Sequence, residues 1–198
     1  MDKAVRALQK NGFDVRVFGT KEEAVSALME DIKVDEPVGL GGSITLQDMK
    51  IYDQLSERGN TVYWHWKAED KGAALRNAAS SKVYITSTNA VTEDGKLINK
   101  DGTGNRVSSM FYGHERVYIV AGKNKIVRNY GDAIYRIEHT AAPMNAKRLN
   151  LTTPCVYTGV CSDCDSPQRI CNVETVINKK PGGVGKIAIY LVNEDLGY

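Results

Sequence analysis

All four cysteines of this 198-residue chain lie in one short segment, CVYTGVCSDCDSPQRIC, which runs from Cys155 to Cys171. Clustered thiols can ligate a metal or an iron–sulfur cluster, pair as disulfides, or act as a redox switch. The spacing is C-x5-C-x2-C-x6-C. Structural zinc sites usually combine two C-x2-C pairs separated by a dozen or more residues, whereas this segment contains only one such pair.

Four thiols on one loop rich in Gly, Ser, Asp and Pro suit a cuboidal iron–sulfur cluster, although the cysteines of bacterial ferredoxins are spaced more tightly. Thiolates held close together repel one another, so a bound cation or cluster makes the arrangement favourable. Zinc, a redox-active dithiol and free thiols remain as alternatives. We expect one centre, a [4Fe–4S] cluster or alternatively zinc, on the Cys-rich loop 152–173, ligated by Cys155, Cys161, Cys164 and Cys171.

A second group of candidate residues lies in the segment VGLGGSITL, where Gly41 and Gly42 precede Ser43. Glycines let backbone N–H groups approach a ligand, and the hydroxyls of Ser43 and Thr45 add donors at the start of a predicted helix. This pattern favours a phosphate or carboxylate. It fits equally well a tight turn with an N-cap serine that binds no ligand, and it is neither a Walker A nor a GxGxxG motif.

Two further segments carry polar side chains directly after predicted strands. In TSTNAVTEDGKLINKDGTGNRVSS, Arg106 follows a turn, from which it could hold a carboxylate or phosphate in bidentate fashion. In VAGKNKIV, Asn124 and Lys125 follow another strand, with a solvated lysine loop as the alternative. The ligand-binding residues predicted from the three segments are Gly41, Gly42, Ser43, Thr45, Asn89, Asp101, Gly104, Asn105, Arg106, Asn124 and Lys125.

The elements that would position these residues alternate along the chain. Apolar runs predict strands at 13–18, 37–42, 61–66, 82–88, 116–122 and 186–193. Helical spacing and capping signals predict helices at 2–12, 20–32, 43–59, 68–80 and 132–150, the last interrupted by Pro143, and EDGK marks a hairpin. This order predicts one α/β domain over residues 1–198, with a mostly parallel sheet, helices on both faces and a ligand at the carboxyl ends of the strands.

Composition argues against several classes of partner. The chain is 42% hydrophobic and 25% charged with a net charge of +2, which gives no strong field for nucleic acid or an acidic membrane surface. The longest apolar runs, VYIVAG and IAIYLV, are far shorter than the roughly 20 residues that span a bilayer. The first residues lack a signal-peptide pattern. We therefore expect a cytoplasmic protein with no nucleic-acid or membrane partner and with reduced thiols, which disfavours disulfides.

Five motifs in succession resemble one known family. They are GLGGSITL, TSTNAVTEDGKLINKDGTGNRV, AGKNKIV, AAPMNAKRL and TPCVYTGVCSDCDSPQRIC, and they extend from about Val38 to Cys171. In this order they resemble the LUD domain, the LutC/YkgG family of lactate utilisation proteins. The resemblance implies an α/β fold similar to the NagB/RpiA/CoA-transferase-like group and a role in bacterial lactate oxidation alongside iron–sulfur partner proteins. No glutamate stands where a CoA-transferase nucleophile would be expected.

Two function classes follow from these observations. In the first, the chain is an oxidoreductase subunit or other component of lactate (2-hydroxy acid) utilisation, which binds a small anionic metabolite and carries a cysteine-ligated iron–sulfur centre. Its partners would be iron–sulfur oxidoreductase subunits or further copies of itself in a homo-oligomer. In the second, it is a non-catalytic metabolite- or redox-sensing module with a structural zinc or free thiols.

Overall fold

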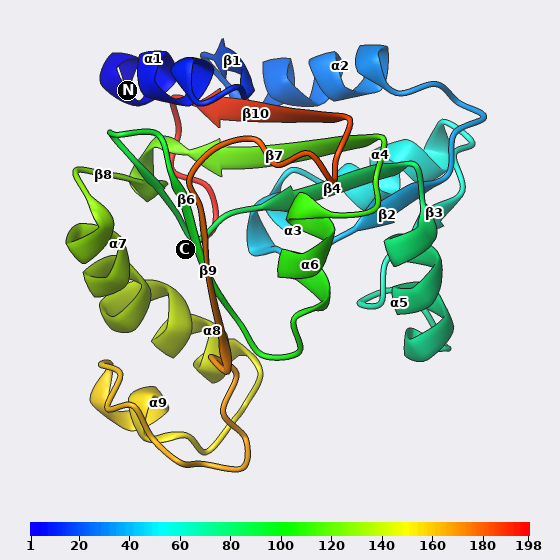
Figure 1. The fold of residues 1–198 in the computed structure, drawn as a ribbon. Coiled ribbons are helices and arrows are strands. Elements are labelled where there is room, and N and C mark those ends of the chain that lie inside the picture. The colour runs from blue at the N-terminus through cyan, green and yellow to red at the C-terminus, as the bar shows by residue number, and fades with distance from the viewer.

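A six-stranded sheet, parallel throughout, forms the centre of the structure, which is a computed structural model of residues 1–198 (Figure 1). Its strands follow the order β1 (Asp14–Phe18), β10 (Lys186–Val192), β7 (Arg116–Gly122), β4 (Val83–Ser87), β2 (Val38–Leu40) and β3 (Val62–Tyr63). The four inner strands are almost continuously apolar, as expected for strands that are covered on both faces. The α/β class predicted from the sequence is confirmed.

Helices cover both faces of this sheet. Along β7, Tyr118 and Val120 pack on one face, while Val117, Ile119 and Ala121 pack on the other. The first face is covered by α2 (Lys21–Asp31), α3 (Ile44–Asp48) and α4 (Ile51–Glu57). The opposite face is covered by α1 (Asp2–Lys10), α5 (Lys71–Ser80) and α6 (Asn105–Phe111). No helix combines the length and the apolar character that crossing a bilayer requires.

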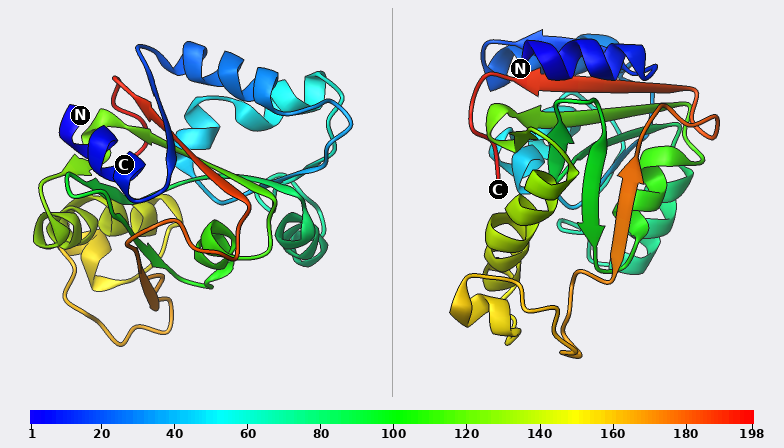
Figure 2. Two further views of the ribbon diagram at one scale, coloured as in Figure 1. Left: turned by 45° about the horizontal axis from the view of Figure 1, so that its top comes forward. Right: turned by 60° about the vertical axis from the view of Figure 1, so that its left-hand side comes forward.

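A second, smaller sheet extends the domain beside the carboxyl ends of the parallel strands (Figure 2). It contains β8 (Ile126–Val127), β5 (Ala90–Thr92), β6 (Leu97–Asp101) and β9 (Val173–Ile177), and the hairpin predicted at EDGK joins β5 to β6. The helical segment that packs against it comprises α7 (Tyr130–Arg136), the π-helical turn η2 (Ile137–Ala141) and α8 (Ala142–Arg148). The 3-10 turn η1 (Lys123–Lys125) follows β7, and α9 (Pro154–Thr158) opens the Cys-rich loop.

Three predicted elements differ in detail. The predicted helix 43–59 is split into α3 and α4, because Lys50 adopts a left-handed conformation with φ 53°. The predicted strand 61–66 ends after two residues, and Trp64 and Trp66 stack on each other in the following turn with ring centroids 5.0 Å apart. The helical segment continues through Pro143, since the wide π-helical turn before it accommodates a residue without an N–H donor.

Candidate functional site

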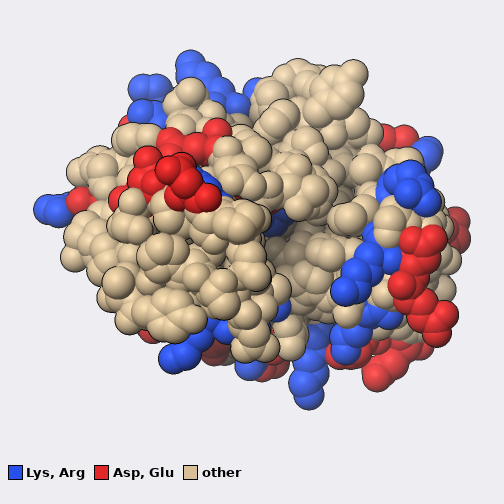
Figure 3. Space-filling view, turned by 90° about the horizontal axis from the view of Figure 1, so that it is seen from below, with Lys and Arg blue, Asp and Glu red and all other residues tan.

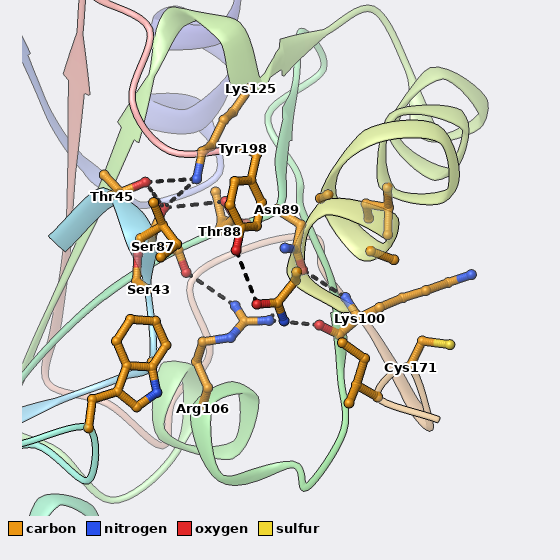
Figure 4. Close-up of a pocket in the computed structure, with 18 residues that line it drawn as sticks. Ser43, Thr45, Ser87, Thr88, Asn89, Lys100, Arg106, Lys125, Cys171 and Tyr198 are labelled. Atoms are coloured by element: carbon orange, nitrogen blue, oxygen red, sulfur yellow. Dashed lines mark hydrogen bonds between the residues drawn. The ribbon is translucent and has the colours of Figure 1, made fainter. Parts of the chain in front are cut away.

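A polar cavity of about 100 Å³ opens at the carboxyl ends of β2, β4 and β7. We call it the lysine cavity, after the buried lysine that lines it. Figure 4 shows the side chains that converge on it from the ends of the strands, from α6, from α8 and from the C-terminal segment. Its polar lining residues are Ser43, Thr45, Ser87, Thr88, Asn89, Lys100, Arg106, Lys125, Asn145 and Tyr198.

Lys125 lies in η1, directly beyond β7, and its side chain is 3% exposed. Its Nζ donates hydrogen bonds to Thr45 Oγ1 at 2.9 Å and to Ser87 Oγ at 3.0 Å (Figure 4). No carboxylate pairs with it. Burial, reinforced by the nearby positive charges of Arg136 and Arg106, lowers the pKa of Lys125 to about 7.

The guanidinium of Arg106, at the start of α6, forms an ion pair and hydrogen bonds with other residues of the protein. Its Nε pairs with Asp101 at 3.2 Å, and one terminal nitrogen donates to Ser87 O at 3.2 Å and to Asn99 Oδ1 at 2.8 Å. The other terminal nitrogen donates to Asn89 Oδ1 at 3.2 Å and to Lys100 O at 2.8 Å. The sequence predicted this residue as a bidentate ligand clamp, but its donors are occupied by contacts that join β4, β6 and α6.

The charged residues that line the lysine cavity are all basic. Three of its lining residues are basic and none is acidic. Lys100 is paired with Glu138, 2.9 Å away, and Arg106 is paired with Asp101, whereas Lys125 and the neighbouring half-buried Arg136 have no carboxylate partner. In the view from below, a hollow lies in a face where uncharged atoms predominate (Figure 3). Buried cations without counter-ions favour the binding of an anion.

The structure brings six of the predicted ligand-binding residues together around this cavity: Gly42, Ser43, Thr45, Asn89, Arg106 and Lys125. Asp101 and Asn105 line an adjacent depression, which shares Gly42 and Arg106 with the lysine cavity. Ser43 and Asn105 therefore lie at the same edge of the sheet.

The other three predicted residues line neither depression, and each has a local structural role. A Cβ on Gly41 would lie 2.5 Å from Thr86 Oγ1, so this glycine allows β2 to approach β4. Gly104 adopts φ +89° directly before α6. Asn124 accepts a hydrogen bond from Leu196 N and donates one to the Gly197 carbonyl, which holds the C-terminal segment beside the cavity.

Several lining residues were not predicted. Ser87 and Thr88 directly precede Asn89 at the end of β4, so their position beyond a strand was a usable signal. Asn145, on α8, and Tyr198 reach the cavity from distant parts of the chain, and the Tyr198 hydroxyl donates to Asn145 Oδ1 at 3.2 Å. Nothing in the local sequence marks these two residues as site residues.

All four cysteines line a second, smaller cavity of about 20 Å³, which we call the cysteine cavity. Arg169 gathers the loop around it, because its guanidinium donates to the carbonyls of Cys164 and Cys171 and pairs with Asp163 at 2.7 Å. Burial raises the pKa of the Cys171 thiol. Ala142, Ile170 and Cys171 line both cavities, so the two share a wall.

The donor set of the cysteine cavity fits a thiolate-bound centre. It offers four sulfur atoms and no carboxylate or imidazole, which is the donor chemistry of iron–sulfur clusters and structural zinc. No three His, Cys, Asp or Glu side chains in the chain are yet drawn together as ligands of one metal ion. Binding such a centre would therefore require the Cys-rich loop to rearrange.

Comparison with known proteins identifies the family. The family model of the LUD domain matches residues 1–192. A crystal structure of a DUF162 family protein from Deinococcus radiodurans superposes with a TM-score of 0.55, covering 96% of this chain and 94% of that chain, at 12% sequence identity. This likeness shows a shared fold. No curated protein matches the sequence. Since the family model covers nearly the whole chain, the protein belongs to the LUD domain family.

Proposed function

We propose that this LUD domain protein is a component of lactate (2-hydroxy acid) utilisation that binds a small carboxylate in the lysine cavity and carries an iron–sulfur centre on the Cys-rich loop. The observation that supports carboxylate binding is Lys125, a buried basic residue of the lysine cavity that has no carboxylate partner, in a lining that contains no acidic residue. The association of the family with lactate oxidation supplies the substrate class.

The size of the lysine cavity supports a small ligand. Its volume of about 100 Å³ is well below the roughly 300–1,000 Å³ of sites for drug-sized ligands. A three-carbon acid suits this space, whereas a dinucleotide or coenzyme A would have to lie mostly outside it. The hydroxyls of Ser43, Thr45 and Ser87 line the same space and offer partners for the carboxylate and hydroxyl of a 2-hydroxy acid.

The shared wall between the cavities supports a redox role. Cys171 and Ile170 line both, so a centre held by the four cysteines would lie next to the bound acid. An iron–sulfur cluster there would supply one-electron transfer. In the same place zinc would stabilise the loop without redox chemistry.

Lactate binding, measured by isothermal titration calorimetry, tests the carboxylate site. We expect Lys125→Met to weaken lactate binding at pH 6.5 by at least about tenfold, because it removes a charge-assisted hydrogen bond. Lys123→Met is the matched control, since Lys123 lies in the same turn with an exposed side chain. Equal lactate affinity in the two variants would contradict the proposal.

One observation bears on the non-catalytic alternative. The lining of the lysine cavity contains no histidine or carboxylate, so Lys125, with a pKa of about 7, is the residue there that could accept a proton. A chain that binds lactate but, with its centre loaded, does not reduce an artificial electron acceptor in its presence would be a sensing module.

A further inference from the structure

The amine of Lys125 is placed to act as a nucleophile in the lysine cavity. We propose that it forms an imine with the carbonyl carbon of a 2-oxo acid. This inference rests on the proposed function, because a 2-oxo acid is the oxidation product of a 2-hydroxy acid and has nearly the same size and charge.

The hydrogen bonds of Lys125 match those of a neutral amine. Its Nζ has two acceptors, Thr45 Oγ1 and Ser87 Oγ, at 2.9 and 3.0 Å. A neutral amine has two N–H bonds and one lone pair, whereas an ammonium would carry a third hydrogen without an acceptor in the protein. The two hydroxyls therefore satisfy the neutral form without using its lone pair, and Lys125 lines the cavity.

The surroundings of Lys125 disfavour its charged form. It is buried and has no carboxylate partner, and the repulsion from Arg136 and Arg106 exceeds the attraction of the more weakly coupled Asp48. The resulting pKa of about 7 leaves much of the amine neutral at neutral pH. Desolvation beside other cationic groups is a known way to activate a lysine for imine formation.

Lys100 lines the same cavity in a contrasting environment. Burial disfavours its charge, but its hydrogen bond and ion pair with Glu138 outweigh burial and raise its pKa. It therefore stays an ammonium with no lone pair to attack a carbonyl. The lysine cavity thus contains one nucleophilic lysine, Lys125, and a second lysine, Lys100, that serves as an internal control.

The reaction is balanced without any other reactant. The lone pair of Lys125 Nζ attacks the carbonyl carbon and forms a C–N bond, and one Nζ proton passes to the carbonyl oxygen to give a carbinolamine. The second Nζ proton leaves with that oxygen as one water molecule, which breaks the C–O bond and leaves the C=N bond. Ser87 and Thr45, which contact Nζ directly, are placed to relay protons, and the amide nitrogens of Asn89 and Asn145, which donate no hydrogen bond within the protein, can hold the carboxylate.

Reductive trapping tests the inference. The full chain is incubated with pyruvate and sodium cyanoborohydride, digested and mapped by mass spectrometry. A hydride adds to the imine carbon, so the labelled lysine gains the mass of pyruvic acid plus two hydrogens minus one water. We expect near-stoichiometric labelling of Lys125 with Lys100 unlabelled, the same in Lys123→Arg, and loss of this label in Lys125→Arg. Excess lactate should protect Lys125 in the unaltered chain, which makes the test independent of how the variants fold.

The outcomes separate this inference from the proposed function. Lactate binding without trapping of pyruvate at Lys125 would overturn the imine and leave the proposed function standing. Trapping at Lys125 without lactate binding would support the imine and contradict the lactate site. Equal labelling by acetone, which has a carbonyl but no carboxylate, would overturn the assignment to 2-oxo acids, and labelling spread evenly over exposed lysines would overturn the special role of Lys125.

Discussion

At the scale of single residues, the burial of Lys125 makes a pH dependence predictable. Its pKa is about 7 in the free protein, and a bound carboxylate would favour the charged form and raise this pKa. Binding of the anion should therefore take up a proton above pH 7. We expect lactate affinity to be constant below about pH 6 and to fall by up to about tenfold per pH unit above pH 7. Titration calorimetry in buffers of different ionisation enthalpy measures this uptake, and a flat profile from about pH 6 to 8.5 would contradict it.

His114 predicts a second pH effect, on stability. Its ring is buried against Tyr84, its Nδ1 donates to the Ser81 carbonyl at 2.6 Å, and its Nε2 has no partner. Burial lowers its pKa below the ordinary value of 6.5. The neutral ring therefore contributes stability that is present above about pH 6.5 and is lost as the pH falls through the lower folded pKa.

We expect the free energy of unfolding to decrease as the pH falls below about 6.5. His114→Phe keeps the stacking on Tyr84 and should flatten this part of the profile in urea unfolding, although the unpaired Ser81 carbonyl lowers stability by about 1–3 kcal/mol at every pH. His139→Gln is the control, because His139 lies exposed on η2 and its replacement should leave the slope largely intact. A slope unchanged by His114→Phe would show that another group causes it.

At the scale of elements, Arg106 joins β4, β6 and α6 through one buried network. Its removal leaves the buried Asp101 carboxylate without its cationic partner and takes a donor from each of the oxygens Ser87 O, Asn99 Oδ1 and Lys100 O. We expect Arg106→Met to destabilise the fold by about 3–5 kcal/mol in chemical unfolding. Arg128→Met, which breaks the exposed pair between Arg128 and Asp132, should change stability little. A stable Arg106→Met variant that lost only ligand affinity would restore the clamp role predicted from its sequence context.

The same scale shows what the sequence could predict. Alternating apolar runs defined the six parallel strands, and their ends located Ser43, Asn89 and Lys125, because residues that follow parallel strands meet at one edge of a sheet. Local patterns could not show that the N–H donors of Arg106 are all hydrogen-bonded to other groups of the protein. They also could not place Asn145 or Tyr198 at the cavity. The position of Asn145 depends on how α8 packs, and that of Tyr198 depends on the hydrogen bond from Asn124 to the C-terminal segment.

At the scale of the whole molecule, the second sheet explains why the cysteines lie beside the lysine cavity. β9 follows Cys171 and pairs with β6, while α8 and α9 precede and open the Cys-rich loop. The loop is therefore anchored at both ends to elements that border the lysine cavity. A long loop pinned in this way is typical of a functional segment.

The last prediction concerns the centre on this loop. The cysteine cavity, at about 20 Å³, holds roughly one water-sized body, so a single zinc ion requires a small closure whereas a [4Fe–4S] cluster requires the loop to open. We expect anaerobically purified or reconstituted protein to contain iron and sulfide and to absorb broadly in the visible range. Loading should then change the hydrogen exchange of residues 152–173 while the parallel strands stay protected.

Cys→Ser variants decide how many thiols take part. We expect each of Cys155→Ser, Cys161→Ser, Cys164→Ser and Cys171→Ser to lose or destabilise the centre, because all four sulfurs line the same cavity. Ser166→Ala, in the same loop, is the control and should keep the metal content of the unaltered chain. Stoichiometric zinc with no visible absorption would establish the structural alternative. The replacement of only two of the four cysteines could instead change the hydrogen exchange of the loop, and only under oxidising conditions. The segment would then be a redox-active dithiol, and the prediction of one centre shared by four cysteines would be wrong.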